Sequence, residues 1–377
     1  MKVVIAVDSF KGSLSSMEAG RAAKAGILAA RPDASVIVKP LADGGEGTTD
    51  ALVEGLNGKK IDITVTGPLG QPVSASYGYL EETSTAVIEM AAAAGITLVP
   101  PDAKDPLSAS TYGVGEMISD ALGRGCRNFI IGIGGSATND GGIGMLKALG
   151  YRFLDRDGKD AGEGAAALGR VMSVDTDGRN PLLSECCFQA ACDVTNPLCG
   201  KNGATYIYGP QKGVTPDMLE TLDAHMAHFA AVTSRTFGAD HSGAPGAGAA
   251  GGLGFALLSY LDASLTPGID LILEAVDLES ELAGADIVVT GEGCLDAQTA
   301  MGKAPAGVAR LAKKYGIKVI AFAGSVTKEA SACNQAGIDG FFPIVRGVTT
   351  LEEAMKPETA RDNMAAAAEQ VFRIIDK

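Results

Sequence analysis

The stretch "FIIGIGGSATNDGGIGM", from Phe129 to Met145, places a short apolar run directly before a loop rich in glycine. The loop carries four polar side chains, those of Ser136, Thr138, Asn139 and Asp140. A strand that ends in such a loop is typical of open α/β sheets, in which ligands bind outside the carboxyl ends of the strands. Two interpretations compete here. Gly132, Gly134 and Ala137 match the G-x-G-x-x-A pattern of dinucleotide-binding loops, whereas the Asn-Asp pair suits phosphates and a metal.

The same alternation of strand and helix occurs at both ends of the chain. Apolar runs followed by helical patterns begin with "KVVIAV", "SVIVKPLA", "ADIVVTGEG", "KVIAFAGS" and "FFPIV". Between them, "IDITVTGPLG" and "PVSASYGYL" indicate antiparallel strands joined by a Gly-Pro turn. We therefore predict a doubly wound α/β domain built from residues 1–60 and 285–377. A second α/β domain with a mixed sheet, residues 61–284, is inserted into it.

Composition excludes several classes of function. The 377 residues carry a net charge of -14, with 45 acidic and 31 basic side chains, which argues against a nucleic-acid partner. The apolar start of the chain is too short for a membrane span, so we expect no membrane partner. Seven cysteines without a C-x-x-C pair suit reduced thiols, and hence a cytoplasmic location.

Acidic and glycine-rich loops follow the predicted strands of the outer domain. They read "DSFKGS" from Asp8, "ADGGEGT" from Ala42 and "TGEGCLDAQT" from Thr290, and Ser325 follows the next strand. Taken singly, each loop could be structural, because glycine supplies turns and aspartate caps helices. Taken together, they predict several carboxylates, a lysine and many free N–H groups at one edge of the sheet.

The inserted domain contributes further loops. "ACDVTNP" places Asp193 just after a strand, and "PGAGAAGG" places glycines before a helix, where free N–H groups favour an anion. Gly246, Gly248 and Gly251 also match G-x-G-x-x-G, but no strand precedes them. The sequence contains no Walker-type phosphate loop.

Three functions remain open on these residues alone. An NAD(P)-dependent oxidoreductase of a small hydroxy acid is one, because Asp155 follows the opening loop by about 20 residues, where a ribose-binding acid would lie. The many acids would repel a pyrophosphate unless a cation intervened, and Mg²⁺ is usually held by one or two carboxylates plus substrate phosphates. Phosphoryl transfer is therefore favoured. A non-catalytic small-molecule-binding protein is the third alternative, although it has little use for so many acids.

Taken in order, the loops resemble those of the type I glycerate kinases over essentially the whole chain. The motifs that carry the resemblance are "DSFKGS", "ADGGEGT", "VTGPLG", "IGIGGSATNDGG", "ACDVTNPLCG", "GPQKG", "PGAGAAGG" and "TGEGCLDAQT", followed by Gly302-Lys303. The resemblance implies ATP-dependent phosphorylation of D-glycerate to 2-phosphoglycerate. It also implies a flavodoxin-like domain plus a second α/β domain, with the active site in the cleft between the domains. The chain departs from the family pattern at Cys294, where an arginine is usual, and at Val214.

The resemblance and the loops together predict the roles of individual residues. Lys11 would neutralise the substrate carboxylate or the transferring phosphate, and Asp193 would accept the hydroxyl proton or else only cap a turn with Asn196. Mg²⁺ would be held by Asp43 and Glu46. The predicted substrate-binding residues are Asp8, Ser9, Glu292, Asp296, Gln298 and Lys303. The predicted binders of ATP are Gly134, Gly135, Ser136, Thr138, Asn139, Gly248 and Gly251. Whether the chain forms a homo-oligomer stays open.

Overall fold

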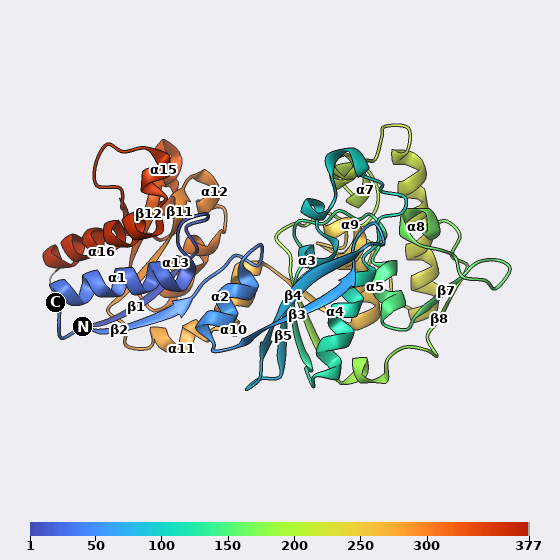
Figure 1. Cartoon of the computed structure of the whole chain (residues 1–377), viewed down its shortest axis with the longest axis horizontal. Helices are drawn as coiled ribbons and strands as arrows, with labels where there is room; N and C mark the ends of the chain where they lie inside the picture. The colour runs from blue at the N-terminus through green and yellow to red at the C-terminus, as the bar shows by residue number, and fades with distance from the viewer. Residues whose placement is uncertain (376–377) are drawn as a thin grey trace. The chain divides into compact units, whose positions relative to one another are not determined.

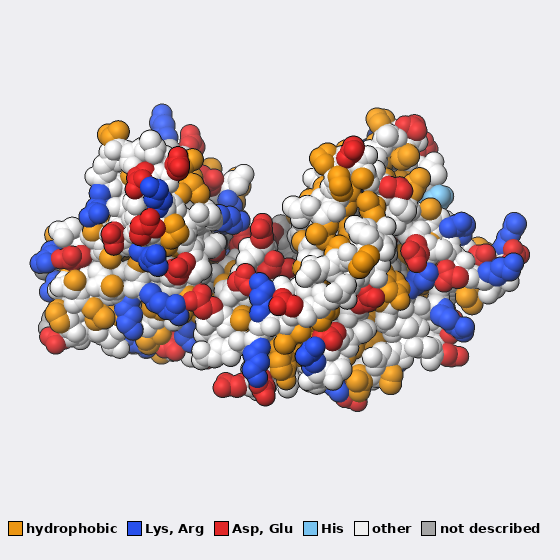
Figure 2. Space-filling view, viewed as in Figure 1, with side chains coloured by type: hydrophobic (Ala, Val, Ile, Leu, Met, Phe, Trp, Pro, Cys, Tyr) orange, Lys and Arg blue, Asp and Glu red, His pale blue; other side chains and the backbone are white. Residues whose placement is uncertain are grey.

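The computed structural model describes residues 1–375, which form an α/β protein of two compact units (Figure 1). Unit 1 contains Met1–Asp43, Asp50–Asn57 and the described chain from Ile269 onward. Unit 2 contains Gly44–Thr49 and Gly58–Gly268. On the face shown in Figure 2, acidic and basic side chains are interspersed. Among residues 1–375, none of the helices combines the length and apolar character that a membrane span requires.

Unit 1 is built on a parallel sheet of five strands in the order β13-β12-β11-β1-β2. The strands are β1 (Lys2–Val7), β2 (Ser35–Pro40), β11 (Ile287–Leu295), β12 (Lys318–Val326) and β13 (Gly340–Pro343). Val3–Val7 are completely buried, because a parallel sheet is covered by helices on both faces and its strands are continuously apolar. The predicted strands at both chain ends are thus confirmed as neighbours in one sheet.

Two long helices of unit 1, α1 (Ser16–Ala30) and α16 (Pro357–Ile374), pack against each other and against the sheet. Gly26 permits this close approach, because a Cβ there would lie 2.0 Å from the carbonyl oxygen of Ala365. The other helices are α2 (Thr48–Gly55), α10 (Gly268–Ala275), α11 (Leu278–Leu282), α12 (Ala297–Ala300), α13 (Ala304–Lys314), α14 (Ala332–Gln335) and α15 (Leu351–Ala354). A 3₁₀ turn, Lys328–Ser331, precedes α14.

Unit 2 contains a mixed sheet of six strands in the order β10-β9-β6-β5-β4-β3. The strands are β3 (Lys59–Thr66), β4 (Pro72–Leu80), β5 (Thr85–Glu89), β6 (Asn128–Gly132), β9 (Cys187–Ala191) and β10 (Ser264–Thr266). β3 and β4 pair antiparallel, as the Gly-Pro turn predicts, whereas β5, β6, β9 and β10 are parallel. A second, two-stranded sheet joins β7 (Arg152–Leu154) to β8 (Ser173–Asp175).

Helices cover this mixed sheet and enclose an aromatic core. They are α3 (Ala91–Ala94), α4 (Tyr112–Gly123), α5 (Ile143–Ala148), α6 (Gly164–Leu168), α7 (Ala204–Tyr208), α8 (Leu219–Phe237) and α9 (Ala249–Leu261). Short 3₁₀ turns lie at Ile96–Leu98, Pro101–Ala103, Pro181–Glu185 and Pro210–Lys212. Phe229 and Tyr260 stack in the core, and Phe153 contacts both rings. These contacts fix α8 and α9 beside β7.

The two units differ from the predicted domain ranges in three places, of which the shortest is residues 58–60, which belong to unit 2. Residues 269–284 belong to unit 1, because Lys39 of β2 donates to the carbonyl of Val276 (3.1 Å) and pairs with Glu281 (3.2 Å). Gly44–Thr49 belong to unit 2, where Gly44 lies directly against Ala191 and Gly268.

Candidate active site

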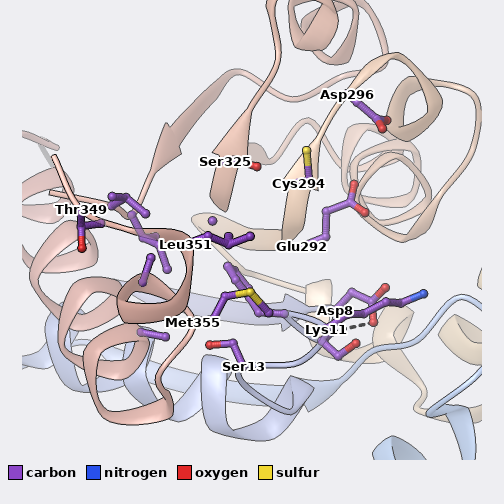
Figure 3. A pocket seen from close by; sticks show the side chains of 18 of the residues that line it. Asp8, Lys11, Ser13, Glu292, Cys294, Asp296, Ser325, Thr349, Leu351 and Met355 are labelled. Atoms are coloured by element: carbon purple, nitrogen blue, oxygen red, sulfur yellow. Dashed lines mark hydrogen bonds between the residues drawn. The ribbon is translucent and has the colours of Figure 1, made fainter. Parts of the chain in front are cut away.

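A pocket of about 570 Å³ lies in unit 1, at the carboxyl ends of β1, β11 and β12 (Figure 3). Loops after parallel strands converge at this edge of a sheet, which is where ligands bind in such folds. Most of the site residues predicted in this unit line the pocket together: Asp8, Ser9, Lys11, Asp43, Glu292, Asp296 and Lys303. Gln298 is exposed and is not among the lining residues.

Asp8 is the most deeply buried carboxyl group of the pocket, with 7% of its surface exposed. It follows β1, whose end is tied to β11 by the Asp8 N–H donating to the carbonyl of Gly291 (2.8 Å). The backbone N–H of Ser9 donates to its carboxylate at 2.6 Å. Burial, with smaller contributions from the charges of Asp43 and Glu292, raises the pKa of Asp8 to about 7. The Ser9 N–H and the charge of Lys11 act in the opposite direction.

Glu292 and Asp296 lie on the side of the pocket formed by β11 and α12. Burial raises the pKa of Glu292, against a hydrogen bond from the Thr299 hydroxyl (2.5 Å) and the nearby charge of Lys303. Asp296 caps α12 by accepting the N–H groups of Gln298 (2.8 Å) and Thr299 (3.0 Å). Slight burial opposes ionisation of Asp296, but these N–H groups and Lys303 together lower its pKa. Asp296 therefore shapes the loop as well as contributing charge.

Cys294 occupies an exposed position in the pocket wall, on β11 beside Ser325 of β12. This is the position at which the family pattern usually has arginine. Among the lining residues that the structure describes, Lys11 and Lys303 are the cations. Positive charge on this edge of the sheet therefore comes from the β1 loop and from the residue just before α13.

The sequence analysis did not identify one whole wall of the pocket. After β13, Ile344 and Val345 lead into a loop and then α15, from which Leu351 and Met355 reach the pocket (Figure 3). A signal was present in the sequence, since apolar residues follow a strand that ends at the ligand-binding edge. Thr350 and Glu353 match a pattern that begins helices, but the apolar residues lack a regular spacing, so the sequence does not predict that they line this pocket.

The two predicted metal ligands fall in different units. Asp43 of unit 1 lines the pocket, whereas Glu46 belongs to unit 2 and is exposed. Over residues 1–375, no three His, Cys, Asp or Glu side chains form a group that could hold a metal by themselves. A cation held by one or two carboxylates together with substrate phosphates needs no such group.

The opening glycine loop lies in unit 2, and its polar side chains turn inward. Ser136, Thr138, Asn139 and Asp140 are buried, whereas Gly134 and Gly135 are exposed. Asp140 accepts hydrogen bonds from the N–H (2.9 Å) and hydroxyl (2.8 Å) of Thr111, at the start of α4. Burial raises the pKa of Asp140 against these hydrogen bonds. This acid holds the loop in place.

A buried lysine that the sequence analysis did not single out supports the same loop. Lys212, with 2% of its surface exposed, donates to the hydroxyl of Ser136 (2.7 Å) and to the carbonyl of Thr138 (2.6 Å). Burial lowers the pKa of Lys212 to about 7, and the charge of Asp140 opposes this effect. In the sequence, Lys212 was noted only as part of the "GPQKG" motif.

The remaining predicted residues of unit 2 lie close to this loop or follow β9. Gly251, at φ +67°, packs on the loop, because a Cβ there would lie 2.0 Å from the carbonyl oxygen of Thr138. A Cβ on Gly248 would lie 2.2 Å from the carbonyl oxygen of Pro197. Asp193 is exposed and accepts the N–H of Gly268 at 2.8 Å.

Asp155, which an oxidoreductase would need for ribose, instead closes a turn after β7. Its carboxylate accepts the N–H groups of Asp157 and Lys159, both at 2.9 Å. The acid that would bind the ribose of a dinucleotide is thus engaged in a local turn. Only the glycine pattern of the opening loop is left to favour a dinucleotide-binding site.

Comparison with known proteins matches the sequence and the fold of this chain to one family. The sequence model of the Glycerate kinase family matches residues 3–376. The chain is 50% identical over 372 residues to "Glycerate kinase" of Bacillus subtilis, covering 97% of each chain. It is 45% identical over 371 residues to "Glycerate 2-kinase" of Escherichia coli, covering 98% of this chain and 97% of that one. A crystal structure from Salmonella typhimurium LT2 superposes with a TM-score of 0.91 at 46% identity, covering 99% and 97% of the two chains. The resemblance predicted from the motifs is confirmed, and the chain belongs to the glycerate kinase family of phosphotransferases.

Proposed function

We propose that the protein transfers the γ-phosphoryl group of ATP to D-glycerate and releases 2-phosphoglycerate. The observation that carries the proposal is the pocket of unit 1 at the carboxyl ends of parallel strands, where Asp8, Asp43 and Glu292 lie with Lys11 and with Lys303, the residue before α13. Phosphoryl transfer depends mainly on positioning and charge neutralisation, and this group of charges suits both. The name of the Escherichia coli relative, "Glycerate 2-kinase", favours the 2-hydroxyl as acceptor.

The two lysines of the pocket have the charge that this substrate requires. Glycerate is an anion, and ATP adds the charge of its phosphates. Lys11 would neutralise the glycerate carboxylate or the transferring phosphate, and Lys303 would add positive charge beside Glu292. The Ser9 hydroxyl lies in the same loop as Lys11 and would hydrogen-bond the substrate.

The carboxyl groups fit a magnesium ion. The negative charges of Asp43 and Glu292 oppose ionisation of Asp8 and raise its pKa. A divalent cation would relieve this repulsion. Oxygen ligands are those that Mg²⁺ prefers, and Asp43 with Glu292 would hold it here. When bound, the ion would neutralise charge on the phosphates of ATP. The role of Glu46 as a ligand stays a prediction.

Two carboxyl groups are candidates for the base that accepts the hydroxyl proton. Asp193 is the one predicted from the sequence. Asp8 is favoured by its raised pKa of about 7, since a general base works best with a pKa near the operating pH. Asp8→Asn and Asp193→Asn separate them, because loss of the base lowers kcat by a factor of about 100 or more. If a variant keeps kcat within about threefold of the parent value, the substituted residue is not the base.

We further propose that unit 1 is flavodoxin-like with unit 2 inserted into it. Counting only its own strands, its sheet has the order 2-1-3-4-5, which is the flavodoxin-like order. Unit 2 accounts for most of the chain between β2 and β11. An active site between two domains, phosphate binding by Gly134 and Gly135, and a cytoplasmic location stay predictions.

A coupled assay of ADP release tests the proposed reaction. D-Glycerate, L-glycerate, glycolate and lactate would be compared as acceptors, each with ATP and Mg²⁺ and again with EDTA. We expect turnover with D-glycerate that EDTA abolishes. Turnover in EDTA, or reduction of NAD with glycerate and no ADP release, would overturn the proposal.

A further inference from the structure

The pocket of unit 1 has two walls of different chemistry (Figure 3). Asp8, Lys11 and Glu292 form a charged wall on the side of β1 and β11, with Asp296 next to them. Leu351 and Met355 face this wall from α15, and Ile344 and Val345 continue the apolar surface. A ligand that fills the pocket therefore has a charged end and an apolar body.

Glycerate alone does not match this arrangement. It has three carbons, each bearing a polar group, and it offers no apolar body. The pocket of about 570 Å³ falls in the range of 300 to 1,000 Å³ that holds ligands of drug size. The second substrate of a kinase, ATP, combines a flat purine with a charged triphosphate.

We propose that the apolar wall formed by Ile344, Val345, Leu351 and Met355 binds the adenine base of ATP, with the phosphates directed toward Lys11 and Lys303. This inference rests on the proposed function. The site that it describes lies within unit 1, and it does not depend on the phosphate role predicted for the glycine loop of unit 2.

Leu351 is the strongest evidence for an apolar occupant. It lines the pocket, yet 76% of its surface is exposed. Its position is well defined, because the Thr350 hydroxyl caps α15 by accepting the N–H of Glu353 (3.2 Å). A large aliphatic side chain held in place at a pocket mouth without cover gains stability when a flat ring packs on it.

The apolar wall is also fixed relative to the charged one. Gly12, at φ +77°, has no side chain, and a Cβ there would lie 2.8 Å from the terminal methyl of Met355. Met355 therefore packs directly on the loop that carries Asp8 and Lys11. The hydroxyl groups of Ser325 and Thr349 line the same pocket and can hydrogen-bond the polar edge of a purine.

Photoaffinity labelling tests the position of the base directly. The full chain would be irradiated with 8-azido-ATP and Mg²⁺, digested with trypsin and mapped by mass spectrometry. We expect adducts on the two adjoining tryptic peptides that carry the apolar wall, residues 329–346 and residues 347–361, the second of which runs past Lys356 because trypsin does not cleave before Pro357. We expect excess ATP to suppress these adducts. Labelling confined to other peptides, such as the one containing Gly134 and Gly135, or no labelling that ATP suppresses, would overturn the inference.

Kinetics of Leu351→Ser give an independent test. We expect KM for ATP to rise at least about fivefold, with KM for glycerate within about twofold of the parent. Inhibition by inorganic tripolyphosphate, which has no base, should be unchanged. Val348→Ser is the matched control, because Val348 is fully exposed in the same loop and does not line the pocket. An unchanged KM for ATP in Leu351→Ser would contradict the base site.

The two proposals fail in different ways. If the parent protein releases no ADP with any acceptor, the proposed function is wrong, whereas labelling that ATP suppresses would still locate the base. If the parent phosphorylates glycerate but Leu351→Ser binds ATP normally, the function stands and the base site is wrong.

Discussion

Replacing Asp8 with asparagine should stabilise the protein while removing its activity. The Asp8 carboxyl is buried beside Asp43 and Glu292, and the pKa of the folded form is about 7, against 3.8 for an unperturbed group. An asparagine oxygen can still accept the Ser9 N–H, and the amide group carries no charge. Above neutral pH the substitution therefore removes a buried charge and keeps the hydrogen bond from Ser9.

The magnitude follows from the two pKa values. A rise from 3.8 to about 7 corresponds to roughly 4 kcal/mol at 1.36 kcal/mol per pH unit. The folded form holds the proton of Asp8 more tightly than the unfolded form does. The stabilisation that comes from this bound proton is fully present below about pH 4 and is lost as the pH rises through about 7. We expect Asp8→Asn to match the parent near pH 4 and to exceed its free energy of unfolding by about 2 to 4 kcal/mol at pH 8.

Urea denaturation in EDTA, without nucleotide, measures this difference across the pH range. Asp296→Asn is the matched control, because its carboxylate lines the same pocket but has a lowered pKa, so the substitution should bring no gain at pH 8. Parallel curves of stability against pH for the parent and Asp8→Asn would refute the reasoning. So would an Asp296→Asn variant stabilised to the same extent.

Three further predictions concern lysines and the unusual cysteine. Lys11→Ala should lower kcat/KM for glycerate by a factor of about 100 or more with an unchanged circular dichroism spectrum, and a near-normal value would leave Lys11 with only a surface role. Cys294→Ser should keep most activity while Lys303→Ala loses much more, and inactivity of a folded Cys294→Ser would give the thiol a chemical role. Lys212 has a depressed pKa, so the unfolded chain binds more protons between about pH 7 and pH 10, and the parent should gain stability relative to Lys212→Met over this window. A difference that stays constant with pH in urea denaturation would contradict that assignment.

The charged wall of the pocket could be predicted from the sequence because the rule for parallel sheets is geometric. An apolar run such as Val3–Val7 predicts a buried strand, and the residues that follow neighbouring parallel strands must meet at one edge. Asp8 and Glu292 are far apart in the sequence, yet Asp8 follows β1 and Glu292 lies in the C-terminal half of the adjacent strand β11. Their position at one edge of the sheet follows from the strand pattern, and the structure adds that the two strands are neighbours.

The rest of the site depends on tertiary contacts that no local pattern contains. The residues around Leu351 have no regular spacing, so nothing in the sequence shows that they turn back over the β1 loop. In the glycine loop, the sequence does not show whether Asp140 and Ser136 face a ligand or the surrounding protein. Ser136 accepts a hydrogen bond from the buried ammonium of Lys212, which comes from a distant segment, and it therefore faces the protein. The contact between Lys39 and Val276 likewise assigns residues 269–284 to unit 1.

The most direct test of the central claim is the ³¹P NMR spectrum of the product formed from D-glycerate, ATP and Mg²⁺. Phosphate on the 2-hydroxyl couples to the single hydrogen of its carbon and gives a doublet, whereas phosphate on the 3-hydroxyl couples to two hydrogens and gives a triplet. We predict a phosphomonoester doublet that grows in step with ADP and that grows slower by a factor of about 100 or more when Lys11→Ala replaces the parent protein. A triplet in place of the doublet, ADP accompanied only by inorganic phosphate, or a doublet of equal rate with Lys11→Ala would contradict the account.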